Sequence, residues 1–244
     1  FPMNKGIGFD RTIRLDWLDA AASLCVQNVE PRELRRRLDE SISGSVHGPD
    51  VRRKTVGVLS AIWLGTEQLA PKIRREALEL FPTLGSPAER VWLHYGLTLV
   101  RYPVFRKVTA VIGRASRTQD RITRRLLKER LAAEYGNLGG LKRAVERIAA
   151  SLTDWGVLNR TERKGVYHIQ ARGFRAGEEL QSWLLSCALF AHPSDGLPYE
   201  DLTHLPELFP FEISVAPSGL RGDGRFDLVR QGGGLEIVSL KGGE

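Results

Sequence analysis

The side chains best suited to chemistry in this sequence are lysines and arginines that recur between residues 121 and 164. A lysine or arginine set against a phosphate releases counterions, so a local cluster gives affinity for nucleic acid that the same charges spread evenly would not. The candidate chemistry is therefore binding of a polyanion. The candidate binding residues are Arg121, Arg124, Arg125, Lys128, Asn137, Lys142, Arg143, Arg147, Arg160, Arg163 and Lys164.

Charge is distributed unevenly along the 244 residues. Residues 1–100 carry 14 basic and 12 acidic side chains, residues 101–172 carry 17 and 6, and residues 173–244 carry 5 and 11. The excess of positive charge thus lies in the middle segment. We expect this segment to face double-stranded DNA and the acidic last segment to face protein partners.

Two helices must position most of these cations. Apolar residues between 141 and 155 recur at alternating steps of four and three, which predicts one buried stripe of an amphipathic helix. Its opposite face carries Lys142, Arg143 and Arg147. A preceding helix that begins at Asp120 is expected to place four cations on one polar face, namely Arg121, Arg124, Arg125 and Lys128.

The connections complete the pattern. Residues 136–140, Gly-Asn-Leu-Gly-Gly, tolerate positive φ and predict a tight turn that lets phosphate approach the next helix. After Gly156 the apolar period changes from 3.6 to 2, which predicts two strands joined by the basic turn 160–165. Together these elements predict a winged helix-turn-helix. The alternative interpretation is an ordinary helical hairpin with a solvated charged face.

The rest of the chain predicts a mainly α fold with a small β part. We expect a helical domain over 1–101, a winged helix-turn-helix over 102–172, and a C-terminal helix with an antiparallel meander over 173–244. Pro31 is expected to begin a helix capped by Asn28, and Ser86 with Glu89 to open another. The expected strands of the meander are residues 209–215, 225–231 and 235–240. The basic triplets at 35–37 and 52–54 are expected to be solvated.

Signatures of catalysis are missing or poorly spaced. The sequence contains no phosphate-binding loop and no dinucleotide-binding glycine motif, and its five histidines have no metal-ligand spacing. Asp227, Glu236 and Lys241 lack the spacing of a metal-dependent nuclease, because the lysine follows the glutamate by five residues. We therefore expect no enzyme activity, no metal and no cofactor.

The sequence also predicts the cellular location of the protein and the state of its cysteines. No run of 18 apolar residues occurs and the N-terminus lacks the layout of a signal peptide, so we expect a cytoplasmic protein that does not enter a membrane. Cys25 and Cys187 are expected to be buried thiols.

The runs Tyr102-Pro103, Lys142-Arg143-Ala144-Val145 and Asp154-Trp155-Gly156-Val157-Leu158 resemble bacterial winged-helix proteins. A helical first half followed by a basic winged helix is also similar, loosely, to the A component of BREX phage-defence systems. The resemblance implies a non-catalytic DNA-binding subunit of a phage-defence or transcription-regulating system.

Two further interpretations remain open. The winged helix could dock a partner protein, with the acidic C-terminal part as a second protein-binding surface, because winged helices serve both purposes. A metal-dependent nuclease is the third.

Overall fold

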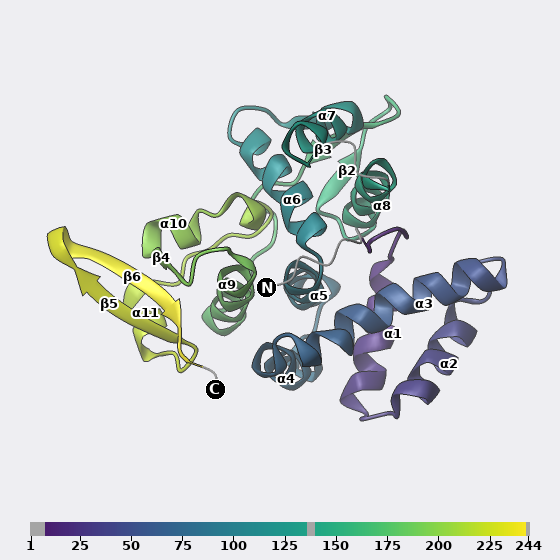
Figure 1. Ribbon diagram of the computed structural model, residues 1–244, viewed down its shortest axis with the longest axis horizontal. Coiled ribbons are helices and arrows are strands. Elements are labelled where there is room, and N and C mark those ends of the chain that lie inside the picture. The colour runs from purple at the N-terminus through teal and green to yellow at the C-terminus, as the bar shows by residue number, and fades with distance from the viewer. Residues whose placement is uncertain (1–7, 136–139, 243–244) are drawn as a thin grey trace.

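The computed structural model describes residues 8–135 and 140–242. The described helices are α1 (Leu15–Val26), α2 (Pro31–Ile42), α3 (Pro49–Trp63), α4 (Pro71–Leu80), α5 (Pro87–Arg101), α6 (Pro103–Ser116), α7 (Arg124–Tyr135), α8 (Leu141–Asp154), α9 (Glu178–Ala191), α10 (Tyr199–Thr203) and α11 (Pro217–Gly222). Four short 3-10 turns, η1 (Gly65–Gln68), η2 (Phe81–Thr83), η3 (Pro206–Leu208) and η4 (Gly232–Gly234), lie between them. The fold is mainly helical with two small antiparallel sheets, in agreement with the predicted class (Figure 1). Within the described ranges, no helix combines the length and apolarity needed to cross a membrane.

Helix α5 is the centre of the molecule, with α9 packed beside it. Every residue of α5 from Val91 to Val100 is buried, as is every residue of α9 from Leu180 to Leu189. The helices approach closely at Gly96, where an added Cβ would lie 2.5 Å from the Trp183 ring. Only hydrogen fits there, so glycine is required by packing rather than by backbone conformation. Trp92, predicted as core, is fully buried.

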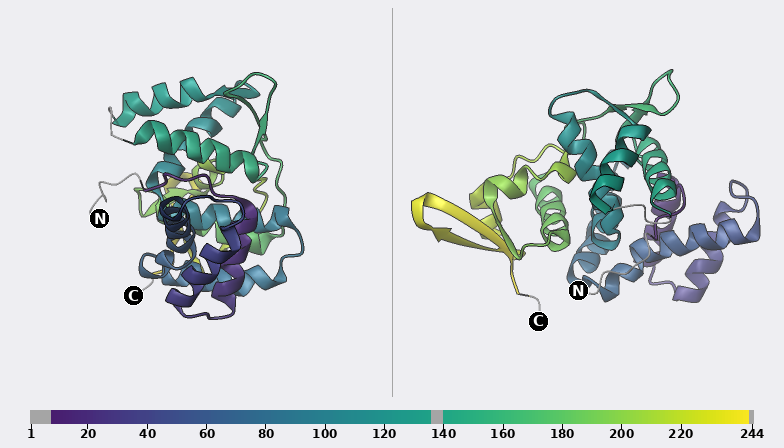
Figure 2. Two further views of the ribbon diagram at one scale, coloured as in Figure 1. Left: turned by 90° about the vertical axis from the view of Figure 1, so that its right-hand side faces the viewer. Right: turned by 45° about the horizontal axis from the view of Figure 1, so that its top comes forward.

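Helices α1 to α4 form one side of the molecule around this centre (Figures 1 and 2). Helix α2 is capped by Glu30, whose carboxylate accepts hydrogen bonds from the backbone N–H groups of Arg32 and Glu33. The predicted cap at Asn28 is therefore wrong; Asn28 instead has a φ of 53° in the turn that leaves α1. The predicted entry to α5 is confirmed, because Ser86 and Glu89 form a reciprocal capping box.

The middle of the chain forms a compact unit from six elements in the order α6, β1 (Arg121–Thr123), α7, α8, β2 (Leu158–Arg160) and β3 (Val166–Ile169). The three strands are antiparallel, with β3 between β1 and β2. The sequence predicted only two strands. Arg121 was predicted on a helical face but lies on β1 opposite His168, and the Thr123 hydroxyl accepts a hydrogen bond from the backbone of Leu126 to begin α7.

The C-terminal sheet contains β4 (Gly196–Pro198), β6 (Leu235–Leu240) and β5 (Phe226–Gln231), in that spatial order. The hairpin of β5 and β6 projects from the body at the end opposite α2 (Figure 1). The predicted strand over 209–215 is wrong, although Phe211 and Val215 are buried as the alternation indicated. Phe211 forms an isolated backbone bridge with Phe174, and the side-chain amide oxygen of Gln181 accepts hydrogen bonds from the backbone N–H groups of Ser214 and Val215.

Candidate nucleic-acid interface

Helix α8 presents basic side chains because its apolar stripe is fully used by the core. The predicted stripe is confirmed, since Leu141, Val145, Ile148, Leu152 and Trp155 are all buried. The opposite face of the helix points outward. Lys142, Arg143 and Arg147 are exposed there, within the first two turns of the helix.

The second half of α8 is held by the segment that precedes α1. The Ser151 hydroxyl accepts a hydrogen bond from the Ile13 backbone N–H at 2.8 Å, and the Trp155 indole donates to the Ile13 carbonyl at 3.0 Å. The Asp154 carboxylate accepts one from the Leu15 backbone N–H at 2.7 Å. A ligand that approaches α8 therefore meets its first half, and Arg147 marks the boundary because its guanidinium lies 3.4 Å from the Thr12 hydroxyl.

The turn between β2 and β3 is built by its own side chains. The Thr161 hydroxyl lies 3.1 Å from the Arg163 carbonyl oxygen and 3.0 Å from that of Val166, which closes the turn. Gly165 has a φ of 81°, a conformation that side chains rarely adopt, and its carbonyl accepts a hydrogen bond from the Arg124 backbone N–H. The turn is thereby fixed to the start of α7. Its three basic side chains are exposed: Arg160, Arg163 and Lys164.

The cations of α7 and β1 have different surroundings. The Arg124 guanidinium is half-buried against Gly165, whereas Arg125 is largely exposed and lies 3.7 Å from the Glu129 carboxylate. Arg121 lies 3.9 Å from its neighbour Asp120. Lys128, which was predicted to contact phosphate, bonds the Glu146 carboxylate of α8 at 2.5 Å.

Glu146 is the acidic residue of α8 that lies beside these cations. Its hydrogen bond from Lys128 lowers the pKa of the carboxyl below the ordinary value of 4.5, and the nearby charges of Arg124 and Arg147 act in the same direction. The carboxylate is therefore charged at neutral pH. It neutralises one of the surrounding positive charges and ties α7 to α8.

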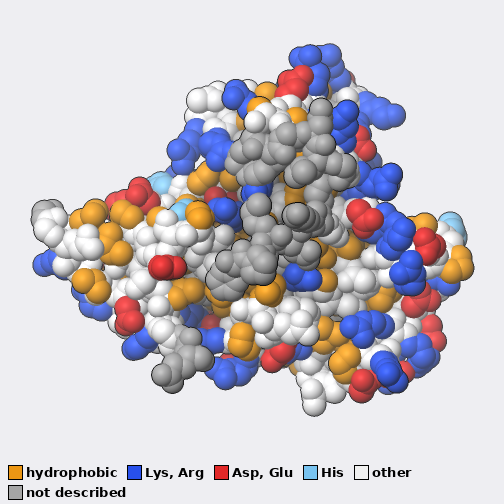
Figure 3. All heavy atoms as spheres, viewed as in Figure 1, with side chains coloured by type: hydrophobic (Ala, Val, Ile, Leu, Met, Phe, Trp, Pro, Cys, Tyr) orange, Lys and Arg blue, Asp and Glu red, His pale blue; other side chains and the backbone are white. Residues whose placement is uncertain are grey.

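The basic side chains of this surface differ from those of the N-terminal helices in how few of them form ion pairs. Seven predicted residues form no ion pair among the residues described: Arg124, Lys142, Arg143, Arg147, Arg160, Arg163 and Lys164. On α2 and α3, by contrast, five of the seven basic side chains are paired with Glu33, Glu40, Asp39 or Asp50, and only Arg32 and Arg35 form no ion pair among the residues described. Figure 3 shows Lys and Arg side chains gathered around the upper end of the molecule, over α7, α8 and the β2–β3 turn, while blue and red alternate over α2 and α3.

The remaining candidate, Asn137, lies outside the residues that the structure describes. Sequence reasoning missed Thr12 and the segment that follows it, because their contacts with α8 span more than 130 residues of chain. It also missed the role of Glu146 as partner of Lys128. The spacing within α7 and α8 could not reveal which faces of the two helices meet.

Other candidate chemistry is sparse in the described part of the chain. No group of three or more His, Cys, Asp or Glu side chains gathers there as a metal site. The Asp227 and Glu236 carboxylates lie on neighbouring strands, and Glu236 is paired with Arg221. Both Cys25 and Cys187 are buried free thiols, as predicted.

Comparison with protein-family models, with curated proteins and with solved structures returned no match to this chain.

Proposed function

We propose that residues 102–172 are a winged helix-turn-helix and that the protein binds double-stranded DNA through it without catalysing a reaction. The order α6, β1, α7, α8, β2 and β3, with β3 central in an antiparallel sheet, supports this proposal. In that arrangement α8 is the recognition helix and the β2–β3 turn is the wing. A DNA major groove is wide enough to admit one helix.

The observation that carries the proposal is the set of unpaired cations on one compact unit. An arginine already bonded to a carboxylate must lose that bond before it meets a phosphate, so it contributes little to counterion release. The seven cations named above carry no such cost. They lie on α7, on the first half of α8 and on the turn between β2 and β3, so a single duplex can meet them together.

Roles follow from position. Lys142, at the exposed start of α8, is placed to reach base edges and Asn137 is proposed to join it, while Arg143 and Arg147 contact phosphate. The wing cations grip the backbone or enter the minor groove, and Arg124 beside them contacts phosphate. Arg121, Arg125 and Lys128 belong to the phosphate-binding set but contribute less, since each lies near a carboxylate.

The test is a pair of double variants that remove the same charge. Arg143→Gln with Arg147→Gln should reduce the slope of log K against log salt by about 1.8 for a random duplex, at about 0.9 per lost phosphate contact. The control, Arg53→Gln with Lys54→Gln, removes two charges that are paired with Asp50 and should leave the slope unchanged. Fluorescence anisotropy with a labelled 20-base-pair duplex measures both. Equal slopes for the two variants would contradict the proposal.

A protein-docking subunit is the alternative, and the C-terminal hairpin favours it. Val229 and Leu235 are 58% and 45% exposed on the projecting strands, and apolar side chains on such an element are typical of a protein contact. Charge reversal at Arg143 and Arg147 discriminates between the functions. Loss of the DNA shift with retention of any protein complex supports DNA binding; the opposite result supports docking.

Membership of a bacterial phage-defence or transcription-regulating system is part of the same proposal. Under it, the acidic C-terminal part contacts a protein partner while residues 102–172 contact DNA. Charge reversal at two exposed carboxylates of α10, Glu200→Lys with Asp201→Lys, tests this assignment, because loss of the partner in co-purification with retention of DNA affinity is expected.

A further inference from the structure

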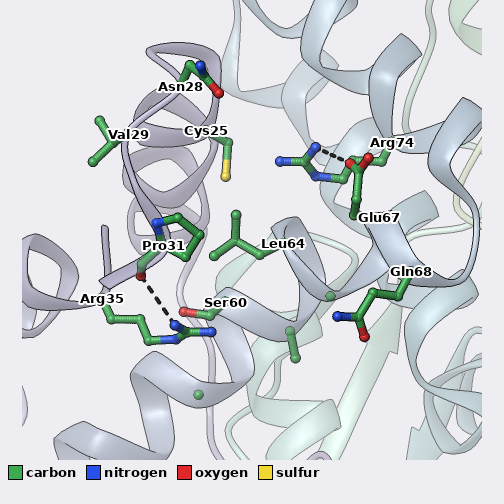
Figure 4. Close-up of a pocket in the computed structure, with 13 residues that line it drawn as sticks. Cys25, Asn28, Val29, Pro31, Arg35, Ser60, Leu64, Glu67, Gln68 and Arg74 are labelled. Carbon is green, nitrogen blue, oxygen red and sulfur yellow. Dashed lines mark hydrogen bonds and ion pairs between the residues drawn. The ribbon is translucent and has the colours of Figure 1, made fainter. Parts of the chain in front are cut away.

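A hollow of about 630 Å³ lies on the side of the molecule away from α7 and the wing, between α1, α2, α3, η1 and α4 (Figure 4). Its volume is within the range of small-molecule sites. One wall is apolar, from Val29, Pro31, Ala61 and Leu64. The other lining groups are polar, and they define what the hollow can hold.

Ser60 is the most informative lining residue. It is only 5% exposed, and its hydroxyl has no hydrogen-bond partner among the described residues. Thr55 and Thr66, on the same stretch of chain, each donate to the carbonyl four residues earlier, which is how a helix ordinarily satisfies a buried hydroxyl. Ser60 does not do so, and a buried hydroxyl left unpaired is unfavourable. Ser60 lines the hollow, so a group bound there is the candidate partner for its buried hydroxyl.

Arg35 supplies a positive charge to the same hollow. Its neighbours Arg36 and Arg37 are bonded to Glu33, but Arg35 makes only one long hydrogen bond, of 3.4 Å, to the Pro31 carbonyl. On the opposite wall Arg74 is already engaged with Glu67 and with the Trp63 carbonyl. The ionic lining residues therefore leave one uncompensated positive charge, that of Arg35.

The remaining polar group does not oppose an anion. The Cys25 sulfur points toward the hollow in Figure 4, and burial raises the pKa of this thiol above its ordinary value of 9.0. The thiol is therefore neutral at physiological pH. Gln68 adds an amide that can donate to an oxygen.

We infer that this hollow binds a small organic carboxylate. Its carboxylate bonds the Arg35 guanidinium and the Ser60 hydroxyl, and its apolar body packs on Val29 and Leu64. Guanidinium and hydroxyl donors suit a carboxylate, and the apolar wall disfavours a bare inorganic ion. This site is separate from the proposed DNA-binding surface and does not depend on it.

Hexanoate, hexanamide and inorganic phosphate are the probes, titrated into the full chain and followed by amide NMR shifts. Hexanoate should bind with saturation and shift residues around Ser60, and hexanamide and phosphate should bind at least tenfold more weakly. No saturable binding of hexanoate up to about 50 mM would overturn the inference. Equal binding of hexanamide would overturn the role of charge, and equal binding of phosphate the role of the apolar wall.

Two variants and a control locate the site. Arg35→Gln and Ser60→Ala should each weaken hexanoate binding at least fivefold, whereas Arg37→Gln, which removes an ion-paired neighbour, should change it less than twofold. Ser60→Ala should also raise the melting temperature of the unliganded protein, because it removes an unpaired buried hydroxyl. A lower melting temperature combined with unchanged hexanoate binding would show that the hydroxyl serves packing alone and would overturn its assignment.

Discussion

Removing the Glu146 carboxylate, which pairs with Lys128 between α7 and α8, should strengthen DNA binding. The Glu146 carboxylate bonds Lys128 at 2.5 Å and also feels the charges of Arg124 and Arg147. Glu146→Gln keeps the size and shape of the side chain but releases the lysine ammonium. The variant therefore offers one additional cation to phosphate.

The size of the effect follows from counterion release. One more phosphate contact steepens the slope of log K against log salt by about 0.9. If wild type and variant bind equally near 1 M salt, where the electrostatic contribution vanishes, the variant binds on the order of eightfold more tightly at 0.1 M and threefold more tightly at 0.3 M. The loss of a partly exposed ion pair costs only about 0.2–1 kcal/mol of folding free energy, so the variant remains folded.

The assay is fluorescence anisotropy with a 20-base-pair duplex across a KCl series. Glu40→Gln is the matched control, because it makes the same change in net charge on α2, where Glu40 pairs with Arg36. The control should leave the slope unaltered. If both variants tighten binding equally, affinity follows the net charge of the chain and not the surface on α7 and α8. If Glu146→Gln weakens binding, Lys128 does not reach DNA.

Two other predictions concern stability. Gly113→Ala should destabilise the protein by about 1–3 kcal/mol, because the added Cβ would lie 1.7 Å from the Pro206 carbonyl oxygen. Gly57→Ala is the control: its Cβ would meet open space, so it should stabilise α3 by up to about 1 kcal/mol. Urea unfolding compares the two variants, and equal effects would contradict the close approach of α6 and η3. The second prediction concerns pH. Burial lowers the pKa of His94 in the folded protein, so as pH falls the unfolded chain binds a proton at this residue before the folded chain does. The free energy of unfolding should therefore decrease below about pH 6.5, by at most about 1.4 kcal/mol per pH unit. His94→Gln should lose that part of the pH dependence in unfolding measured from pH 5 to 8, and an unchanged profile would assign it to other groups.

The elements that the sequence predicted well are those specified by local pattern. The stripe of α8 repeats over four turns, and each of its five apolar residues is buried. Ser86 and Glu89 open α5 as predicted, and the capping box that they form joins two residues within one helical turn. Such features need no knowledge of distant parts of the chain.

The features that sequence did not predict depend on distant partners. Strand β1 is three residues long, and Arg121 pairs with His168, so neither length nor periodicity separates it from the start of α7. The alternation at Phe211 and Val215 is typical of a strand, but Phe211 forms only an isolated bridge with Phe174, and the Val215 backbone bonds the Gln181 side chain. The period of apolar residues indicates which side chains are buried, but it does not identify the hydrogen-bond partners of the backbone.

The same limit applies to the two proposed sites. Sequence located the cations, yet the neutralisation of Lys128 by Glu146 depends on how α7 packs on α8, and it could not be read from either helix alone. Ser60 could not be identified from sequence at all, because nothing in its helical pattern indicates that its hydroxyl lacks a hydrogen-bond partner in the folded protein. Whether a charged or polar side chain already has an ion-pair or hydrogen-bond partner is therefore more informative about binding than the number of charges in the sequence.

Hydrogen bonds between the segment at residues 13–15 and α8 attach the charged surface to the N-terminal helices. Ile13 and Leu15 together make three hydrogen bonds to the last turns of α8, and α1 begins at Leu15. Because the two Ile13 hydrogen bonds are buried and costly to leave unpaired, they oppose rotation or sliding of α8 relative to α1. The first half of α8 is also tied to α7 through Glu146, so under the proposed function Lys142 and Arg143 would meet a duplex with little loss of backbone entropy. Ser151→Ala removes the acceptor for the Ile13 N–H, so it should weaken DNA binding without changing the salt slope, because no charge is lost. A change in slope instead would mean that the segment around Ile13 sets which cations reach the phosphates.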